Sequence, residues 1–190
     1  ELVWLPQADG QCRLVWHITL RPDLVARWEY FVDARTGQVQ DHYHHTCHNG
    51  PTTAQATLLT GATQTINTYQ LDNQYYLIDA SRPMYNAGRS RLPNNPVGAI
   101  WTLDARNTYL DNLNHITTSN NQWGAQRNAA SAHHNAATCY EYYRTTHGRN
   151  SINGRGGNIL SVINVTYQNG QSMGNAFWNG ELMAYGNGDQ

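Results

Sequence analysis

The sequence contains no lysine and few charges of any kind. Arginine supplies all 12 basic residues, against 13 Asp and Glu, and the formal net charge is −1. Charged residues make up 13 % of the chain, about half the usual fraction for a soluble domain. Such a balanced chain lacks the basic surface that binds nucleic acid, so no nucleic-acid partner is expected.

Long apolar runs are also missing. The longest, such as residues 14–16, are far shorter than the roughly 20 residues that a transmembrane helix needs, so no membrane partner is expected. No signal peptide is visible. Because the chain opens on the strand-like ELVWL, we expect the true start to lie upstream, where a leader could have been removed. The 6 Trp and 12 Tyr indicate a folded chain and exclude general disorder.

Cysteine is scarce, and Cys12, Cys47 and Cys139 match no zinc-ribbon spacing. The sequence is compatible with a Cys12–Cys47 disulfide plus one thiol, or with three free thiols. Asn164 begins an Asn-x-Thr sequon, which is compatible with secretion but is a weak signal.

The first fifty residues read as a small unit. Residues 12–20 and 27–39 alternate like strands, with a turn at residues 33–37. Two strands cannot close a core, so further elements must come from upstream or from the next domain. Residues 41–55 lose periodicity and contain Asn-Gly-Pro, which predicts a linker. We therefore predict domains at 1–48 and 49–190.

The second domain combines short strands with one long helix. TINTYQL, QYYLIDA and AIWTLDA predict a mainly antiparallel sheet. Helical spacing of apolar residues from Asn128 to Tyr143 predicts a helix, with Asn128 or Ser131 as its N-cap and Gly148 at its end. A loop at 154–158 and a strand in ILSVINV follow. The predicted fold class is α+β.

Two groups of histidines suggest metal binding, but each has a simpler explanation. His42, His44, His45 and His48 surround Cys47, yet they form one continuous stretch, and structural zinc sites usually draw ligands from two separate segments. A solvated linker is the favoured interpretation. His133, His134 and His147 lie in the predicted helix without a His-Glu-x-x-His motif, so packing or helix-end roles are favoured.

The sequence shows no pair of carboxylates suited to acid–base catalysis, no Gly-x-Ser-x-Gly elbow and no phosphate-binding loop. The residue types alone therefore indicate a binding surface without a catalytic centre in this chain.

Five segments carry a family resemblance. Residues 133–158 contain Tyr-Glu-Tyr-Tyr followed by His-x-Arg-x-Ser, and residues 175–189 read NAFWNGELMAYGNGD. These segments resemble the long helix and the edge-strand signature of thermolysin-type secreted zinc metallopeptidases. YYLIDASRPMY and AIWTLDA are similar, more weakly, to that family's N-terminal β-meander. WEYFVDARTGQV resembles the end of its PepSY pro-region.

The resemblance implies that residues 1–48 end a small α+β PepSY-like pro-region and that 49–190 form the β-rich N-terminal peptidase domain. The family's zinc ligands and general base belong to His-Glu-x-x-His and a downstream Glu, which this chain lacks. The resemblance therefore assigns catalysis and zinc to a missing C-terminal catalytic domain, and the fragment alone is expected to be inactive. Its implied partners are a peptide or protein substrate and that missing domain, and its implied location is extracellular.

The resemblance assigns substrate binding to residues 175–178. Asn175 matches an amide that hydrogen-bonds the substrate backbone. Ala176 and Trp178 match residues whose main chain pairs with the substrate main chain, and Phe177 matches the aromatic wall of a side-chain subsite. The structural alternative is that Phe177 and Trp178 are core aromatics and that Asn175 caps a turn.

Some residues depart from the family pattern. ITTSNNQW, residues 116–123, has Thr and Ser where relatives carry Asp, and neutral hydroxyls are poor calcium ligands, so calcium is not expected there. Met173 and Gly174 replace common neighbours of the signature, which leaves subsite preference open. Relatives are cleaved in the linker after the pro-region. The chain is therefore either an uncut precursor fragment or a homologue that is not cleaved at this place.

Two other functions remain open. The first is a stand-alone PepSY-containing module that binds or inhibits a protease without catalysis. The second is a sugar-binding β-domain in which Trp101, Trp123 and Trp178 stack on sugar rings.

Overall fold

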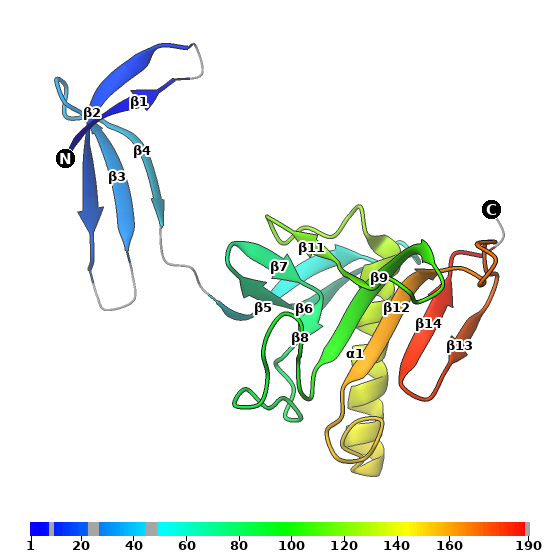
Figure 1. Ribbon diagram of the computed structural model, residues 1–190. Helices are drawn as coiled ribbons and strands as arrows, with labels where there is room; N and C mark the ends of the chain where they lie inside the picture. Colours follow the sequence, from blue (N-terminus) through cyan, green and yellow to red (C-terminus); the bar gives the residue numbers. More distant parts are fainter. Residues whose placement is uncertain (8–9, 23–26, 45–48, 189–190) are drawn as a thin grey trace. The chain divides into compact units, whose positions relative to one another are not determined.

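The computed structural model describes residues 1–7, 10–22, 27–44 and 49–188. The chain divides into two compact units, Glu1–Cys47 and His48–Gln190, and each is described by itself. Figure 1 labels the strands and the helix. None of the described helical segments is long and apolar enough to cross a lipid bilayer.

The first unit is an antiparallel sheet with the strand order β1-β2-β3-β4. Its strands are β1 Leu2–Pro6, β2 Cys12–Leu20, β3 Trp28–Asp33 and β4 Val39–His44. The predicted strand at 12–20 is confirmed, and the predicted 27–39 strand divides into β3, a turn and the start of β4. In this turn Asp33 Oδ1 accepts the N–H groups of Arg35 at 2.9 Å and Thr36 at 2.8 Å, and Gly37 has φ of +73°.

The two faces of this sheet differ in an unusual way. Its apolar face carries six exposed apolar side chains from β1 and β2: Leu2, Trp4, Leu14, Trp16, Ile18 and Leu20. The opposite face buries Val15 together with the carboxylates of Glu29 and Asp33. No second layer of described residues within this unit covers the apolar face, as expected for strands that cannot close a core alone.

The predicted linker at 41–55 is wrong over most of its length. β4 continues to His44, and β5 begins at Gly50. The ring of His42 stacks on that of Tyr30, with centroids 5.5 Å apart, so His42 belongs to a sheet face and not to a solvated linker. Residues 45–48, which include three of the candidate metal ligands, lie outside the described residues.

The second unit contains two sheets. The smaller is antiparallel, in the order β11-β7-β6-β5. Its strands are β5 Gly50–Thr57, β6 Thr63–Leu71, β7 Gln74–Tyr76 and β11 Thr117–Thr118. The larger has the order β10-β9-β12-β14-β13, and β8 also pairs with β9. Its strands are β8 Ile78–Asp79, β9 Ile100–Thr108, β10 Asn114–His115, β12 Ile159–Val165, β13 Ala176–Trp178 and β14 Leu182–Gly186.

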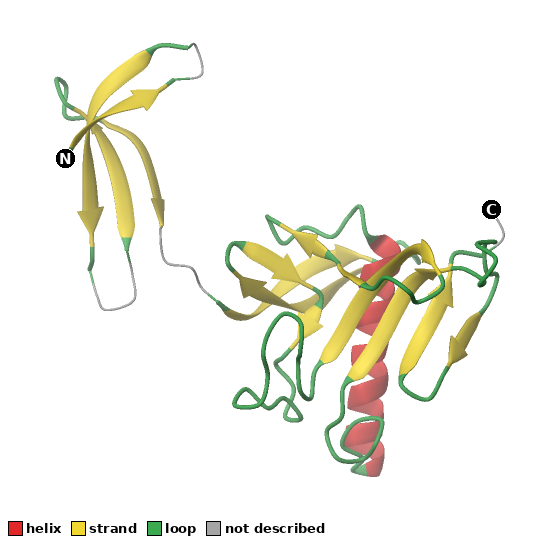
Figure 2. Cartoon of the chain, viewed as in Figure 1, coloured by secondary structure: helices red, strands yellow, loops and turns green. Residues whose placement is uncertain are grey.

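Most strand pairs are antiparallel, as predicted, but the centre of the larger sheet is not. β12 runs parallel to both β9 and β14. Parallel neighbours require a crossover, and the segment between β9 and β12 contains the long helix α1, Arg127–His147. Figure 2 shows this helix running behind the sheet. The helix gives the chain its α+β character.

The predicted helix is confirmed, but its predicted N-cap is wrong. The N-cap is Gln126, which makes no side-chain cap hydrogen bond. Ser131 lies inside the helix and accepts the N–H of Leu59 at 2.9 Å. At the other end Gly148 adopts the left-handed conformation, with φ of +62°, and its N–H bonds the carbonyl of Arg144 at 3.1 Å. This end matches the prediction because only a residue free of Cβ strain turns there easily.

Buried side chains join α1 to both sheets. One cluster packs Ala129, Ala130 and Ala132 of the helix against Trp123, Leu77 and Ile66. A second places Ala136 and Tyr140 against Ile100 of β9. These contacts assign Ile100 and the residues in phase with it to the face that α1 covers. Cys12 and Cys139 are free thiols. Cys47, the other half of the disulfide considered above, lies outside the described residues.

Candidate functional site

β13 lies at the end of the larger sheet, and this position makes it the candidate site. It pairs with β14 alone, through Ala176 with Tyr185, Phe177 with Ala184 and Trp178 with Met183. An edge strand leaves every second backbone N–H and C=O free to pair with another extended chain.

The hydrogen bonds at either end of β13 show which residues carry the free groups. Gly186 donates its N–H to the carbonyl of Asn175 at 3.0 Å, and Asn179 donates its N–H to the carbonyl of Leu182 at 3.3 Å. In an antiparallel pair, bonded positions alternate, so 175, 177 and 179 face β14. Ala176 and Trp178 therefore direct their backbone groups to the open edge.

Side chains in this strand alternate between the two faces of the sheet. Phe177 packs with Leu103, Val162 and Ala184 in one cluster on the face opposite α1, which we call the front face. Asn175 is in phase with Phe177, is exposed, and makes no side-chain hydrogen bond within the described part of the chain. Trp178 is 46 % exposed, so it is not a core residue.

β14, the strand that pairs with β13, is itself held by close packing. A Cβ added to Gly186 would lie 1.9 Å from the carbonyl oxygen of Met173, so only glycine fits there. At the turn into β14, Asn179 Oδ1 accepts the N–H groups of Glu181 and Leu182, both at 2.9 Å. Sequence reasoning missed Gly186, since a glycine at the end of an apolar run carries no signal of a distant close approach.

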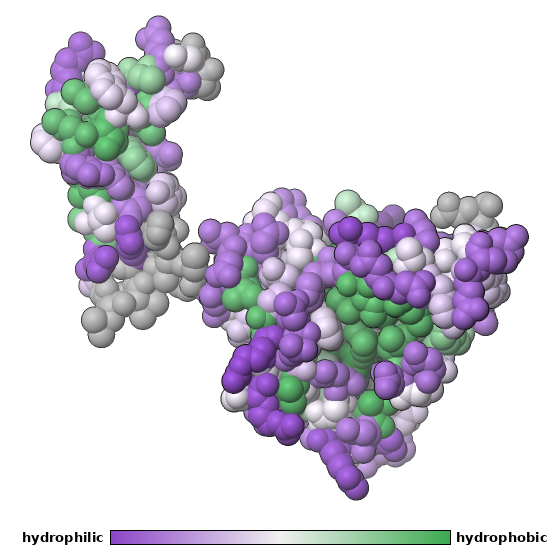
Figure 3. Space-filling model, in the orientation of Figure 1, coloured by the Kyte–Doolittle hydropathy of each residue, from purple (hydrophilic) through white to green (hydrophobic). Residues whose placement is uncertain are grey.

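The front face forms an apolar surface. Apolar side chains of β9, β12 and β14 pack together on this face. Figure 3 shows hydrophobic residues over these strands on the side away from α1. The cluster joins buried Leu103, Val162 and Leu182 to the partly buried Trp101 and Phe177. This surface is continuous with the candidate site.

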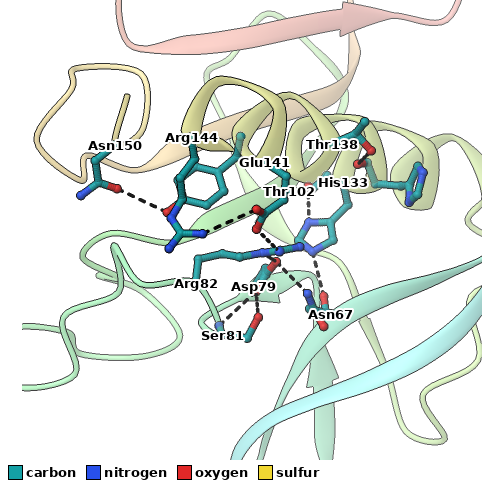
Figure 4. Close-up of polar contacts among 12 residues, drawn as sticks. Asn67, Asp79, Ser81, Arg82, Thr102, His133, Thr138, Glu141, Arg144 and Asn150 are labelled. Atoms are coloured by element: carbon teal, nitrogen blue, oxygen red, sulfur yellow. Dashed lines mark hydrogen bonds and ion pairs between the residues drawn. The ribbon is translucent and has the colours of Figure 1, made fainter. Parts of the chain in front are cut away.

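A polar network ties β8 and the residues just after it to α1 (Figure 4). The fully buried Asp79 accepts Arg82 Nε at 2.6 Å, and Arg82 Nη1 bonds Glu141 of the helix. Burial by itself raises the pKa of Asp79, but hydrogen bonds from Ser81 and Asn67 and the charge of Arg82 outweigh it and hold that pKa below its ordinary value. Sequence spacing could not reveal Glu141, which lies far from Arg82 in the chain.

His133 has a packing role, as predicted. Its Nδ1 lies 2.9 Å from Thr102 Oγ1, and its Nε2 lies 2.8 Å from the carbonyl oxygen of Asn67. Burial lowers the pKa of His133, which favours the neutral ring. Both ring nitrogens are occupied by protein groups and are unavailable to a metal.

The residues that the structure describes contain no group of three or more His, Cys, Asp or Glu placed to hold a metal ion. In the 116–123 segment, Asn121 is committed to structure: its Oδ1 accepts Thr68 Oγ1 and Trp123 Nε1, both at 3.0 Å. Its Nδ2 donates to the carbonyl of Thr53, also at 3.0 Å. The donor set therefore fits neither zinc nor calcium.

The structure also bears on two other expectations, the sugar-binding surface and the sequon at Asn164. Trp123 is fully buried, so Trp101, Trp123 and Trp178 do not form the sugar-stacking surface considered above. The sequon residue Asn164 is half-buried; its Nδ2 donates to Asp104 at 2.8 Å and its Oδ1 accepts Asn128 Nδ2 at 3.0 Å. Its amide is thus engaged in the fold.

Comparison with known proteins agrees with this geometry. Residues 53–190 match the model of the thermolysin metallopeptidase catalytic domain. The chain is 34 % identical over 193 residues to bacillolysin from Bacillus amyloliquefaciens, covering 100 % of this chain and 34 % of that protein. It is 31 % identical to the thermostable neutral protease NprT of Geobacillus stearothermophilus, over 95 % of this chain and 33 % of NprT.

A similar match is found with thermolysin from Alicyclobacillus acidocaldarius, which is 31 % identical over 95 % of this chain and 33 % of thermolysin. The chain thus spans about a third of the length of the curated relatives it matches. The matched segment contains both β13 and the polar network around Arg82. On these grounds the chain belongs to the thermolysin metallopeptidase family.

Proposed function

We propose that this chain is the substrate-binding part of a secreted zinc metalloendopeptidase, with the end of a PepSY pro-region at residues 1–48 and the N-terminal peptidase domain at 49–190. The observation that carries the proposal is the open edge of β13, where Ala176 and Trp178 direct free backbone groups outward.

An extended peptide would add to this edge as a further strand. The N–H and C=O groups of Ala176 and Trp178 would pair with its main chain, which holds peptides of many sequences. The free amide of Asn175 would donate to a substrate carbonyl and accept a substrate N–H. Phe177, on the same face as Asn175, would form an apolar wall beside one substrate side chain.

Zinc would be held by residues outside this chain, because its described residues offer no fitting ligand set. When bound in such enzymes, zinc polarises the scissile carbonyl and activates a water molecule. The role of this chain's own residues is to fix the peptide in an extended conformation, which lowers the entropic cost of reaching the reactive geometry.

The apolar front face supports a second part of the proposal. Trp101, Leu160 and Phe177 stay partly exposed and belong to one cluster that ends at the β13 edge. We place the rest of the peptidase on this face, so that its catalytic groups and the β13 edge form the two sides of one cleft.

The first test is the gene sequence beyond the codon for Gln190. A His-Glu-x-x-His motif followed by a downstream Glu would support the peptidase proposal. A stop codon would contradict it and favour the stand-alone PepSY-containing module.

The second test concerns the site. In the protein that the gene encodes, Asn175→Ala should lower kcat/KM for peptide hydrolysis by about tenfold, which corresponds to one or two lost hydrogen bonds in the transition state. Asn169→Ala, in an exposed turn, is the matched control. Equal kcat/KM for Asn175→Ala and wild type would exclude the assigned role of Asn175.

A further inference from the structure

A pocket of about 360 Å³ opens at the C-terminal end of α1. Its walls are mainly apolar and aromatic: Ala136, Tyr140 and Tyr143 from the helix, and Ile152 and Ile159 from the segment that follows. Neither the edge strand β13 nor the front-face cluster contributes a residue to it.

The pocket has a buried base and an apolar rim. Tyr140 is buried at the base, and its hydroxyl donates to Asn150 Oδ1 at 3.3 Å. At the rim, Tyr143 is 50 % exposed and Ile152 is 40 % exposed. A ligand that filled the pocket would remove this apolar surface from water, which is the main driving force for binding in such hollows.

Arg149 supplies a fixed positive charge in the wall. Its backbone N–H bonds the carbonyl of Tyr143 at 3.1 Å, and its Nε donates to the carbonyl of Ser151 at 3.3 Å. Its Nη2 donates to the carbonyl of Ile152. Both side-chain acceptors are neutral, and Nη1 has no partner among the described residues. The guanidinium is therefore held in place with its charge uncompensated and one donor group free.

Arg149 is the one charged residue in the wall of the pocket, and basic residues outnumber acidic ones in the segment that forms it. Glu141 is the one acidic residue between residues 139 and 159, and it already pairs with Arg82 and with Arg144, the latter at 3.8 Å. Arg155, in the same loop as Arg149, has no acidic partner within the described residues. An anionic group would thus be attracted to this end of the molecule.

We propose that this pocket binds a peptide segment in which a large apolar side chain, such as Phe, is followed by acidic residues. The apolar side chain enters the pocket between Tyr143 and Ile159, and a carboxylate accepts hydrogen bonds from Arg149 Nη1. Such a site would hold a partner protein without using β13, so it does not depend on the peptidase proposal.

Two free thiols among the described residues allow a direct test on the 190-residue chain. Cys139 lines the pocket, whereas Cys12 is an exposed thiol in the first unit. The probe is acetyl-Gly-Phe-Asp-Glu-Gly-amide, and the comparison peptides replace Asp-Glu by Asn-Gln or Phe by Ala. Alkylation by iodoacetamide is followed at each cysteine by mass spectrometry. The probe should slow alkylation of Cys139 severalfold and leave that of Cys12 unchanged.

Variants then distinguish binding of the probe in this pocket from general attraction of an acidic peptide to positive charge. Arg149→Gln should weaken binding of the probe about tenfold, as expected for loss of a charge-assisted hydrogen bond. Arg155→Gln is the matched control and should change affinity little. Because Arg149 also holds its loop in place, a second variant is needed. Tyr143→Ala removes an exposed part of the pocket wall, so it should weaken binding of the probe peptide without lowering Tm much.

Three results would overturn the proposal: equal protection of Cys12 and Cys139, equal protection by all three peptides, or equal weakening by Arg149→Gln and Arg155→Gln. Unchanged affinity in Tyr143→Ala would also contradict it.

Discussion

The N–H of Gly186 bonds the carbonyl of Asn175 at 3.0 Å, and this contact sets the phase of the whole β13 edge. Since bonded positions alternate, it turns the backbone of Ala176 and Trp178 outward while Phe177 faces β14. The side chain of Asn175 stays free at the same time. A single backbone contact therefore defines which groups are available to a peptide.

Proline substitutions test this phase. Ala176→Pro removes an N–H that points to the open edge, and proline is tolerated on edge strands, so Tm should change little while peptide binding is lost. Phe177→Pro removes a group that pairs with β14 and should cost about 3 kcal/mol or more. Thermal unfolding and peptide titration of both variants are the measurements. A stable Phe177→Pro with an unstable Ala176→Pro would show the opposite phase.

The close approach at Gly186 predicts a steric effect. Gly186→Ala would place Cβ 1.9 Å from the Met173 carbonyl oxygen, so the strand must shift, at a cost of about 2–3 kcal/mol. The free energy of unfolding is measured with denaturant. Gly124→Ala, whose added Cβ meets no atom within 4 Å, is the control and should be nearly neutral.

Arg82 should contribute strongly to stability. Arg82→Leu leaves the carboxylate of Asp79, which is 0 % exposed, without its cation, and breaking such a buried pair costs about 3–5 kcal/mol. Arg89→Gln changes an exposed arginine and is the control. Denaturant midpoints of the two variants should differ clearly; equal midpoints would mean that Arg82 does not stabilise the fold.

The first unit should lose stability in acid. The hydrogen bond from Thr19 is the largest cause that lowers the pKa of Glu29; burial opposes it, and Arg27 and His17 add to the lowering, which takes the pKa from 4.5 to about 2. The folded pKa lies below the unfolded one, so this stabilisation is complete above pH 4.5 and is lost as pH falls towards about 2.

Hydrogen exchange of β3 amides across this pH range measures the effect. Glu29→Gln should lower stability at neutral pH and flatten the pH profile. Some slope should remain, because backbone hydrogen bonds from Thr36 and Arg35 also lower the pKa of Asp33. Glu181→Gln, at an exposed position, should leave the profile unchanged. An identical profile in Glu29→Gln and wild type would exclude Glu29 as a source of the pH dependence.

Asn121 is expected to stabilise the 116–123 segment. Asn121→Ala removes the partners of Trp123 Nε1 and Thr68 Oγ1 and should cost about 2–4 kcal/mol. Asn120→Ala, at an exposed position, is the control. Because the neutral groups here are poor calcium ligands, Tm should be equal in calcium and in excess EDTA. A Tm that rises with calcium would contradict this interpretation.

Features set by local sequence were predicted well. The helix was expected over 128–148 and occupies Arg127–His147, because helical periodicity and a C-terminal glycine act within a few residues. The strand at 12–20 was predicted for the same reason. The linker prediction failed where Asn-Gly-Pro suggested a long break, since Gly50 and Pro51 instead begin β5 through their pairing with Gln70 and Tyr69 of β6.

The sequence by itself determined the α+β class, the long helix and the family, because composition, periodicity and an extended motif are all properties of neighbouring residues. The family resemblance already implied an edge strand at residues 175–178, but only the tertiary structure decided that Gly186 must be glycine and that Arg82 joins Asp79 to Glu141. These depend on contacts between residues far apart in the chain. Such contacts form only when the strands, loops and α1 pack together, and local spacing carries no record of them.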